Sequence, residues 1–154
     1  RAAYPELKIE MHLMVEAPER ALPLWFDSGA DRAVVHWEAL SNKWIVERYP
    51  DRVIVLGTKV ETPVEDLFPY LTPTSSVLIL AVPPGYSGQP FDPAVLEKIR
   101  MLGERFPGLE IEVDGGINAQ TIRLVRGVAD IALSASYIFK SPDPRAAFEK
   151  LTAA

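Results

Sequence analysis

The chain has 154 residues, of which 48% are hydrophobic and 24% charged, and its formal net charge at pH 7 is −5. These values are typical of one globular domain, and acidic and basic residues are mixed along the sequence, so no basic run predicts binding to nucleic acid. The absence of cysteine excludes disulfides, thiolate metal ligands and cysteine nucleophiles, and it fits a reducing cytoplasm. No apolar stretch approaches the roughly 20 residues that a membrane-spanning helix needs.

The chain begins at Arg1, without a methionine, and we expect it to be the C-terminal portion of a longer protein. Short apolar runs then alternate with helical patterns, which is typical of βα units and a parallel sheet. We expect strands at residues 7–15, 33–37, 52–57, 76–82, 109–113 and 131–134. We expect helices at residues 18–28, 41–48, 63–70, 93–106, 118–126 and 144–152.

Residues typical of helix caps precede three of these helices. Thr62 and Glu65 have the spacing of a capping box, in which each side chain bonds the other residue's backbone N–H. Asn118 and Asp143 stand at positions where an N-cap side chain accepts from the first turn. We therefore expect the helices at 63–70, 118–126 and 144–152 to begin at these caps.

Six βα units fit either an open doubly wound sheet or part of a (β/α)8 barrel, because both use parallel strands and right-handed crossovers. A complete barrel needs eight strands and typically about 250 residues. We expect residues 1–154 to form a single α/β domain, a barrel without its first two units. Its first and last strands would then be open edges, which favour aggregation, so we expect the isolated polypeptide to be poorly soluble or unstable.

Three loops rich in small residues follow predicted strands, at residues 84–89, 114–118 and 135–137. Glycine lets the backbone approach an anion closely, and N–H groups at helix starts bind phosphate. In a barrel, phosphate lies at the last strand-to-helix loops. We expect the three loops to converge on one phosphate pocket.

Two titratable side chains lie at predicted strand ends. His12 is near the end of the first strand, and Asp114 directly follows the fifth. A histidine nitrogen and a carboxylate oxygen suit Zn²⁺ or Fe²⁺, although such a pair is also common as a purely structural hydrogen bond. His36 ends the second strand, where we interpret it as a hydrogen-bonded structural histidine in preference to a ligand.

Several ordered motifs resemble those of the ribulose-phosphate 3-epimerase family, over essentially the whole chain. They lie at residues 11–18 (MHLMVEAP), 36–39 (HWEA), 62–65 (TPVE), 84–89 (PGYSGQ), 113–117 (VDGGI) and 136–139 (SYIF). The resemblance implies a (β/α)8 TIM barrel of the ribulose-phosphate-binding type. It also implies metal-dependent conversion of D-ribulose 5-phosphate to D-xylulose 5-phosphate through an enediolate, the chemistry of the pentose phosphate pathway.

By this resemblance, Asp114 is the proton donor and a metal ligand, and His12 is a second ligand that also borders the substrate. The residues expected to hold the phosphate and neighbouring hydroxyls are Gly85, Tyr86, Ser87, Gly88, Gly115, Gly116, Ala135 and Ser136. The implied metal is zinc or iron(II), with manganese and cobalt as further candidates. His12 and Asp114 ligand atoms should lie about 3 to 4 Å apart around a tetrahedral ion, or up to about 6 Å without it.

The chain departs from the family pattern in two ways. The serine of the family's first strand and the His-x-Asp pair of its second are absent, so we expect the 154-residue chain alone to be inactive. Ser87 and Ala135 also stand where the family commonly has glycine. We expect these substitutions to perturb the phosphate site without abolishing it. We expect the ligand to be a sugar phosphate. At full length we expect a cytoplasmic homo-oligomer, although the sequence does not decide whether a targeting segment precedes Arg1.

Two alternatives remain at this point. One is another phosphate-binding barrel, such as a hexulose-phosphate synthase or a phosphoribosyl isomerase. His12 and the lack of an Asp-x-Lys-x-x-Asp array argue against it. The other is a catalytically dead sugar-phosphate binder that kept the phosphate loops.

Overall fold

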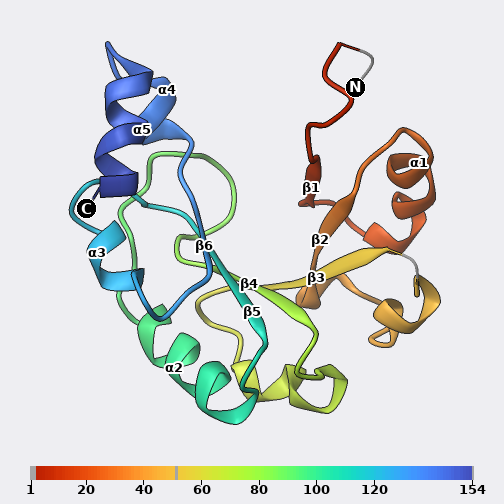
Figure 1. Cartoon of the computed structure of the whole chain (residues 1–154). Coiled ribbons are helices and arrows are strands. Elements are labelled where there is room, and N and C mark those ends of the chain that lie inside the picture. The colour runs from red at the N-terminus through yellow and green to blue at the C-terminus, as the bar shows by residue number, and fades with distance from the viewer. Residues whose placement is uncertain (1–2, 51, 154) are drawn as a thin grey trace.

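A computed structural model describes residues 3–50 and 52–153 (Figure 1). Its sheet has six strands in the order β1-β2-β3-β4-β5-β6, and each neighbouring pair is parallel. The strands are β1 (Glu10–Leu13), β2 (Arg32–His36), β3 (Val53–Thr58), β4 (Ser76–Leu80), β5 (Glu110–Asp114) and β6 (Ile131–Leu133). The prediction of six sequential parallel strands is confirmed.

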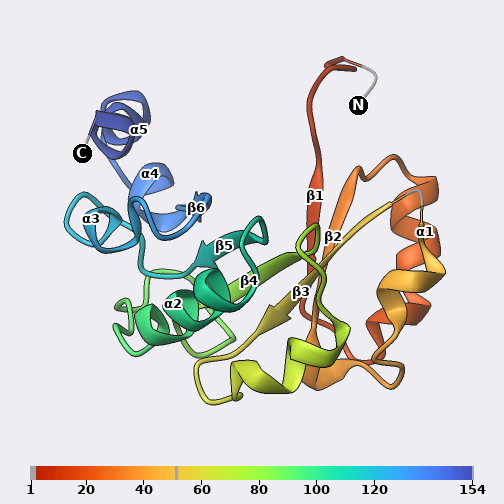
Figure 2. The same cartoon turned by 60° about the horizontal axis from the view of Figure 1, so that its bottom comes forward.

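The sheet curls into part of a barrel, with helices on its outer side (Figures 1 and 2). Arg32 on β2 forms a hydrogen bond of 2.6 Å with Glu110 on β5, although two strands separate them in the sheet. Only strong curvature brings these side chains together across an interior. Within the part of the chain that the structure describes, β1 pairs only with β2 and β6 only with β5, so the expected open edges are confirmed.

Most helices are shorter than the sequence predicts. The α-helices are α1 (Leu22–Asp27), α2 (Val95–Arg105), α3 (Ile122–Val125), α4 (Ser136–Phe139) and α5 (Pro144–Ala153). Of these, α5 spans the predicted residues 144–152, whereas α4 was not predicted. The 3-10 segments are η1 (Pro18–Arg20), η2 (Trp37–Ala39), η3 (Ile45–Arg48) and η4 (Val64–Tyr70). None of the helices in residues 3–50 and 52–153 is long and apolar enough to cross a membrane.

The capping box at the start of η4 is a wrong prediction. Pro63 occupies the N-cap position without a side-chain hydrogen bond, and Thr62 instead donates its hydroxyl to Glu38. Pro69 lies inside the same segment, where it removes a backbone donor and disfavours a regular α-helix.

A second predicted helix, at 41–48, is reduced to the single 3-10 segment η3. Asn42 accepts a hydrogen bond of 3.1 Å from the backbone N–H of Trp44 through its side chain. This local bond offers the backbone an alternative to a helix.

The predicted caps of the two later helices have different outcomes. Asp143 accepts a hydrogen bond of 2.9 Å from the Ala146 N–H, so it caps α5 as predicted. Asn118 accepts from the Gln120 N–H at 2.8 Å and the Thr121 N–H at 3.2 Å, but α3 begins later, with Thr121 at its N-cap, so the prediction that Asn118 caps this helix is wrong.

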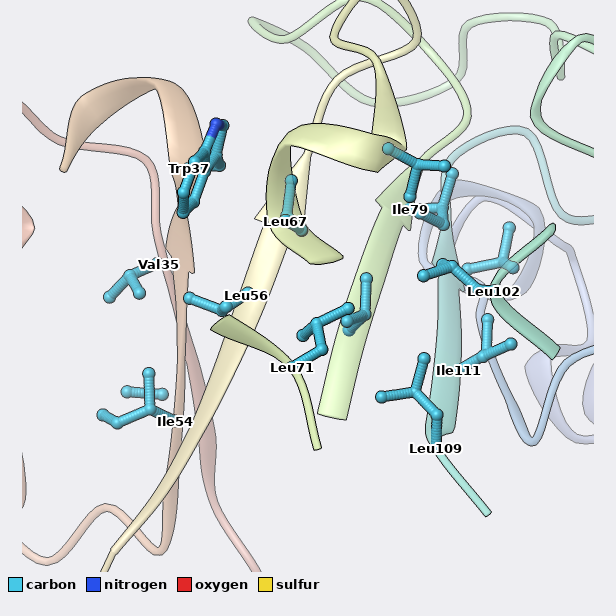
Figure 3. Packing of buried hydrophobic residues seen from close by; sticks show 14 of the residues in the cluster. Val35, Trp37, Ile54, Leu56, Leu67, Leu71, Ile79, Leu102, Leu109 and Ile111 are labelled. Atoms are coloured by element: carbon cyan, nitrogen blue, oxygen red, sulfur yellow. The ribbon is translucent and has the colours of Figure 1, made fainter. Parts of the chain in front are cut away.

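The core has two layers because successive strand residues point to opposite faces. One layer lies between the strands and the helices and includes Val35, Leu56, Ile79 and Ile111 (Figure 3). The other fills the barrel interior and consists of Val34, Val55, Leu78, Leu80 and Val82. Burial on both faces explains why β3 and β4 are nearly continuous apolar runs.

The amino end of the barrel interior holds a charged cluster around Arg32. Its guanidinium donates to Glu10 at 2.8 Å, to Glu110 at 2.6 Å and to Glu112. The Glu112 side chain is completely buried. Burial, followed by the nearby charge of Glu10, raises the pKa of Glu112 to about 7, against the opposing effect of Arg32. The sequence did not predict this cluster.

Candidate functional site

The three small-residue loops line one cavity of about 260 Å³ at the carboxyl end of the strands. The predicted phosphate-loop residues 85–88, Gly115, Gly116, Ala135 and Ser136 all border it, together with Asp114. The predicted convergence of the loops is therefore confirmed. His12 does not line this cavity and lies beside it, in contact with Asp114.

Two glycines let the loops after β4 and β5 pack against each other. Gly116 has a φ of 67°, and a Cβ at this position would lie 2.3 Å from the backbone nitrogen of Phe91. A Cβ on Gly115 would lie 2.7 Å from Val82. Any larger residue would force the loops apart, so these two positions set the width of the cavity.

Ser87 and Ala135, which replace glycines common in the resembling family, fit their positions without backbone strain. Ala135 has a φ of −105°, which any L-residue adopts. Ala17 is the one described non-glycine residue with positive φ, so Ser87 is also free of this strain.

His12 and Asp114 meet across the curved sheet. His12 Nδ1 lies 3.3 Å from Asp114 Oδ2, and the two side chains are 18% and 27% exposed. This distance confirms the predicted proximity of the pair, and both side chains remain partly exposed. The two groups reach each other only because the sheet curls, since three strands separate β1 from β5 in the sheet.

His36 belongs to the same constellation, which the sequence did not predict. It is 5% exposed, and its Nε2 lies 2.8 Å from Nε2 of His12. The interpretation of His36 as a hydrogen-bonded residue holds, but its partner is the candidate ligand itself. A usable signal was present: both histidines lie at or near the carboxyl ends of consecutive parallel strands, and such ends share one edge of the sheet.

The positively charged side chain of Lys140 lies beside the three small-residue loops. An adjoining cavity of about 260 Å³ is lined by Gly88, Gly116, Ser136 and Lys140, among others. The Lys140 ammonium would lie 3.3 Å from a Cβ placed on Gly88. No acidic side chain pairs with Lys140 within residues 3–50 and 52–153. The sequence motifs gave no indication of this residue.

A model of the ribulose-phosphate 3-epimerase family matches residues 2–139. The chain belongs to this family. It is 32% identical over 145 residues to the ribulose-phosphate 3-epimerase of Eremothecium gossypii, covering 92% of this chain and 61% of that protein. It is also 32% identical over 157 residues to the Mycobacterium leprae enzyme of that name, covering 97% and 70%. A rice relative named as a cytoplasmic isoform is 32% identical over 144 residues, covering 88% and 63%.

The chain thus spans about three-fifths of the length of the curated relatives from Eremothecium gossypii and rice. Two solved structures share its fold. The 3-hexulose-6-phosphate synthase of Salmonella typhimurium superposes with a TM-score of 0.71 at 16% identity, covering 99% of this chain and 74% of that one. The thiamine phosphate pyrophosphorylase of Pyrococcus furiosus gives 0.60 at 19%, covering 95% and 81%. The fold is that of a ribulose-phosphate-binding TIM barrel, here as six consecutive units.

The implied divalent metal fits the pair of groups at the carboxyl end. One imidazole nitrogen and one carboxylate oxygen at 3.3 Å have the spacing of adjacent ligands around a tetrahedral ion. No third histidine, cysteine, aspartate or glutamate joins them to form a metal-binding group in the described ranges 3–50 and 52–153. His12 and Asp114 could therefore supply two ligands, fewer than the four of a complete tetrahedral site.

Proposed function

We propose that the protein, at its full natural length, epimerises D-ribulose 5-phosphate to D-xylulose 5-phosphate. One observation carries the proposal: the His12–Asp114 pair at 3.3 Å stands beside a cavity formed by three loops rich in small residues. Family membership makes this reaction the first to consider, since the relatives named above are ribulose-phosphate 3-epimerases.

The loops suit the phosphate end of the substrate. Residues 85–88, Gly115, Gly116, Ala135 and Ser136 line a cavity wide enough for a phosphate group and the hydroxyls next to it. Gln89 stiffens the first loop, because its side-chain amide donates to the backbone oxygens of Pro83 at 2.6 Å and Tyr86 at 2.9 Å. Lys140 adds positive charge at the rim.

Asp114 suits proton transfer at the carbon beside the ketone. Its carboxyl group is half-buried at the cavity wall, so a substrate anchored by its phosphate would present its reacting carbon within reach. Inversion at that carbon needs a second acid–base group on the opposite face, which the family supplies from a strand outside these 154 residues. A divalent cation held by His12 and Asp114, zinc or iron(II) first, would stabilise negative charge on the enediolate.

A sugar-phosphate binder without catalysis is the second candidate, for the 154-residue chain alone. The three small-residue loops border one cavity, while His12 and Asp114 have no third candidate ligand beside them within residues 3–50 and 52–153. We expect this polypeptide to bind a sugar phosphate and to show no epimerisation, even with added metal. For the full-length protein we propose a cytoplasmic homo-oligomer.

A coupled assay with D-ribulose 5-phosphate tests the proposal on the full-length protein after metal removal and reloading with Zn²⁺ or Fe²⁺. We expect turnover that depends on the added metal, together with about one metal ion per chain. The 154-residue polypeptide is the matched control. Sugar-phosphate binding without turnover by the loaded full-length protein would favour the binder.

A further inference from the structure

A chain of polar contacts leads from Glu38 to the candidate metal ligands. Glu38 Oε2 lies 3.5 Å from Nδ1 of His36, and Nε2 of His36 lies 2.8 Å from Nε2 of His12. Nδ1 of His12 then faces Asp114 at 3.3 Å. The two imidazole rings are nearly parallel, at 10°, with centroids 5.0 Å apart. Nothing in the phosphate-loop motifs uses Glu38 or His36.

Glu38 is held in place from the side opposite His36. Its Oε1 accepts from the Lys59 N–H at 3.0 Å, from the Thr58 hydroxyl at 3.3 Å and from the Thr62 hydroxyl. Burial alone would raise the pKa of Glu38, but the donors on His36, Lys59 and Thr62 outweigh it and hold that pKa well below its usual range. Glu38 is therefore a fixed carboxylate that can only accept hydrogen bonds.

Strand β3 leaves room for the His36 ring. Gly57 pairs with His36 in the β2–β3 register. A Cβ on Gly57 would lie 3.0 Å from Val34 and 3.5 Å from Nε2 of His36. Glycine at this position keeps the ring where it contacts both Glu38 and His12.

In the neutral form of each ring, the direction of these contacts determines which nitrogen carries the proton. A lone pair on His36 Nδ1 would repel the Glu38 carboxylate, so Nδ1 carries the proton and Nε2 is left as an acceptor. His12 must then donate from its own Nε2. Its Nδ1 is left with a lone pair that faces the Asp114 carboxylate, and two acceptors at 3.3 Å attract a cation between them.

We propose that Glu38 and His36 are positioning residues that fix the tautomer of His12, so that its Nδ1 lone pair and Asp114 together accept a divalent cation. This inference rests on the proposed function for the role of the cation. Outer partners of this kind commonly change metal affinity by about 10- to 100-fold when they are removed.

Zinc affinity of the full-length protein, measured by competition with a chromophoric chelator at one neutral pH, tests the proposal. We expect His36→Leu, which removes the acceptor for His12, to weaken zinc binding about 10- to 100-fold. His36→Gln restores a carbonyl acceptor and should recover part of the loss. Glu38→Gln should weaken binding less than His36→Leu. Glu16→Gln is the charge control. Glu16 borders the same cavity of about 330 Å³ as His36, but it is not part of the series of contacts from Glu38 to Asp114.

The tautomers can be read directly, without activity or a variant. Long-range proton–nitrogen NMR spectra of the zinc-loaded full-length protein, labelled with ¹⁵N-histidine, should show a proton on His12 Nε2 and on His36 Nδ1. A proton on His12 Nδ1 would overturn the proposal, as would a zinc affinity of Glu38→Gln and His36→Gln both equal to wild type. Failure of the proposed function would appear separately, as zinc-loaded wild type that does not epimerise the substrate while these spectra are as expected.

Discussion

The two ends of the barrel interior are built from the same three strands and differ in where their positive charge comes from. At the amino end, β1, β2 and β5 supply Glu10, Arg32 and the pair Glu110 and Glu112, and the arginine contacts all three carboxylates. At the carboxyl end, the same strands supply His12, His36 and Asp114. No lysine or arginine side chain joins this second group among the ion pairs of residues 3–50 and 52–153.

The difference separates a structural cluster from a candidate functional one. The carboxylates at the amino end have the Arg32 guanidinium as a built-in cation, so their cluster serves the fold. A carboxylate that faces an imidazole lone pair needs a cation from outside, so its cluster is suited to bind one. This agrees with the general division of labour in TIM barrels, where chemistry lies at the carboxyl ends of the strands and stability at the amino ends.

The largest effect should come from Asp114→Asn in the full-length protein. Asparagine keeps the shape of the side chain but cannot take or give the substrate proton, so we expect turnover to fall by about 10²- to 10⁴-fold. Binding of inorganic phosphate should be nearly unchanged, because the loops keep their backbone. Steady-state kinetics measures turnover, and titration with inorganic phosphate measures binding. Asp66→Asn, at an exposed aspartate of η4, is the control, and turnover of Asp114→Asn within about tenfold of wild type would remove Asp114 from the mechanism.

Arg32→Met tests the other end of the barrel and should affect stability before activity. Removing the guanidinium leaves three carboxylates without their cation, and since only Glu112 is fully buried, we expect a loss of about 1 to 3 kcal/mol. Urea denaturation of the full-length protein should show this loss, while zinc affinity at the carboxyl end stays as in wild type. Arg100→Met is the matched control, since Arg100 also contacts two glutamates but on an exposed helix face. Equal denaturation midpoints for the two variants would refute the structural role of the Arg32 cluster.

Glu112 should give the amino end a distinct pH dependence. Its folded pKa of about 7 lies above the ordinary glutamate value of 4.5, so between these pH values the folded state holds a proton that the unfolded state has released. Stability should therefore fall as pH rises from about 4.5 to about 7, by on the order of 1 to 3 kcal/mol, and then level off. Glu112→Gln should flatten this slope in urea denaturation measured across the window. Glu104→Gln, at an exposed glutamate of α2, should keep the slope, and a Glu112→Gln protein with the wild-type slope would contradict the assignment.

The strands could be predicted from sequence more reliably than the helices. The run at residues 77–82 is apolar throughout because both faces of this segment are buried, and local hydrogen bonds do not disturb that pattern. The segments at 41–48 and 63–70 form 3-10 segments in place of the predicted helices, because of contacts that hydrophobic periodicity does not reveal. In the first, Asn42 bonds the backbone nearby, and in the second, Thr62 is engaged by Glu38.

The candidate site could be predicted only in part. His12 and Asp114 could be placed together because each lies near the carboxyl end of its strand, and these ends share one rim of a barrel. The contact of His36 with His12 depends on strand register, and the Arg32 cluster depends on how far the sheet curls. Neither quantity is encoded in a local pattern of residues.

The smallest expected effect concerns Lys140, a second source of positive charge at the carboxyl end. Its ammonium lies near Gly88 and Ser136 and borders the cavity next to the phosphate loops, so it can contact a bound phosphate while remaining exposed to solvent. Because solvent screens an exposed charge, we expect Lys140→Met to weaken phosphate binding by about three- to tenfold at low salt, and by less at high salt. Isothermal titration of the full-length protein with inorganic phosphate at two ionic strengths measures the loss of affinity at low salt and at high salt. Lys150→Met is the control, because Lys150 borders a neighbouring cavity together with Lys140 but not the one at the loops. If Lys140→Met and Lys150→Met bind phosphate equally well at low salt, the backbone of the loops holds the phosphate without help from this lysine.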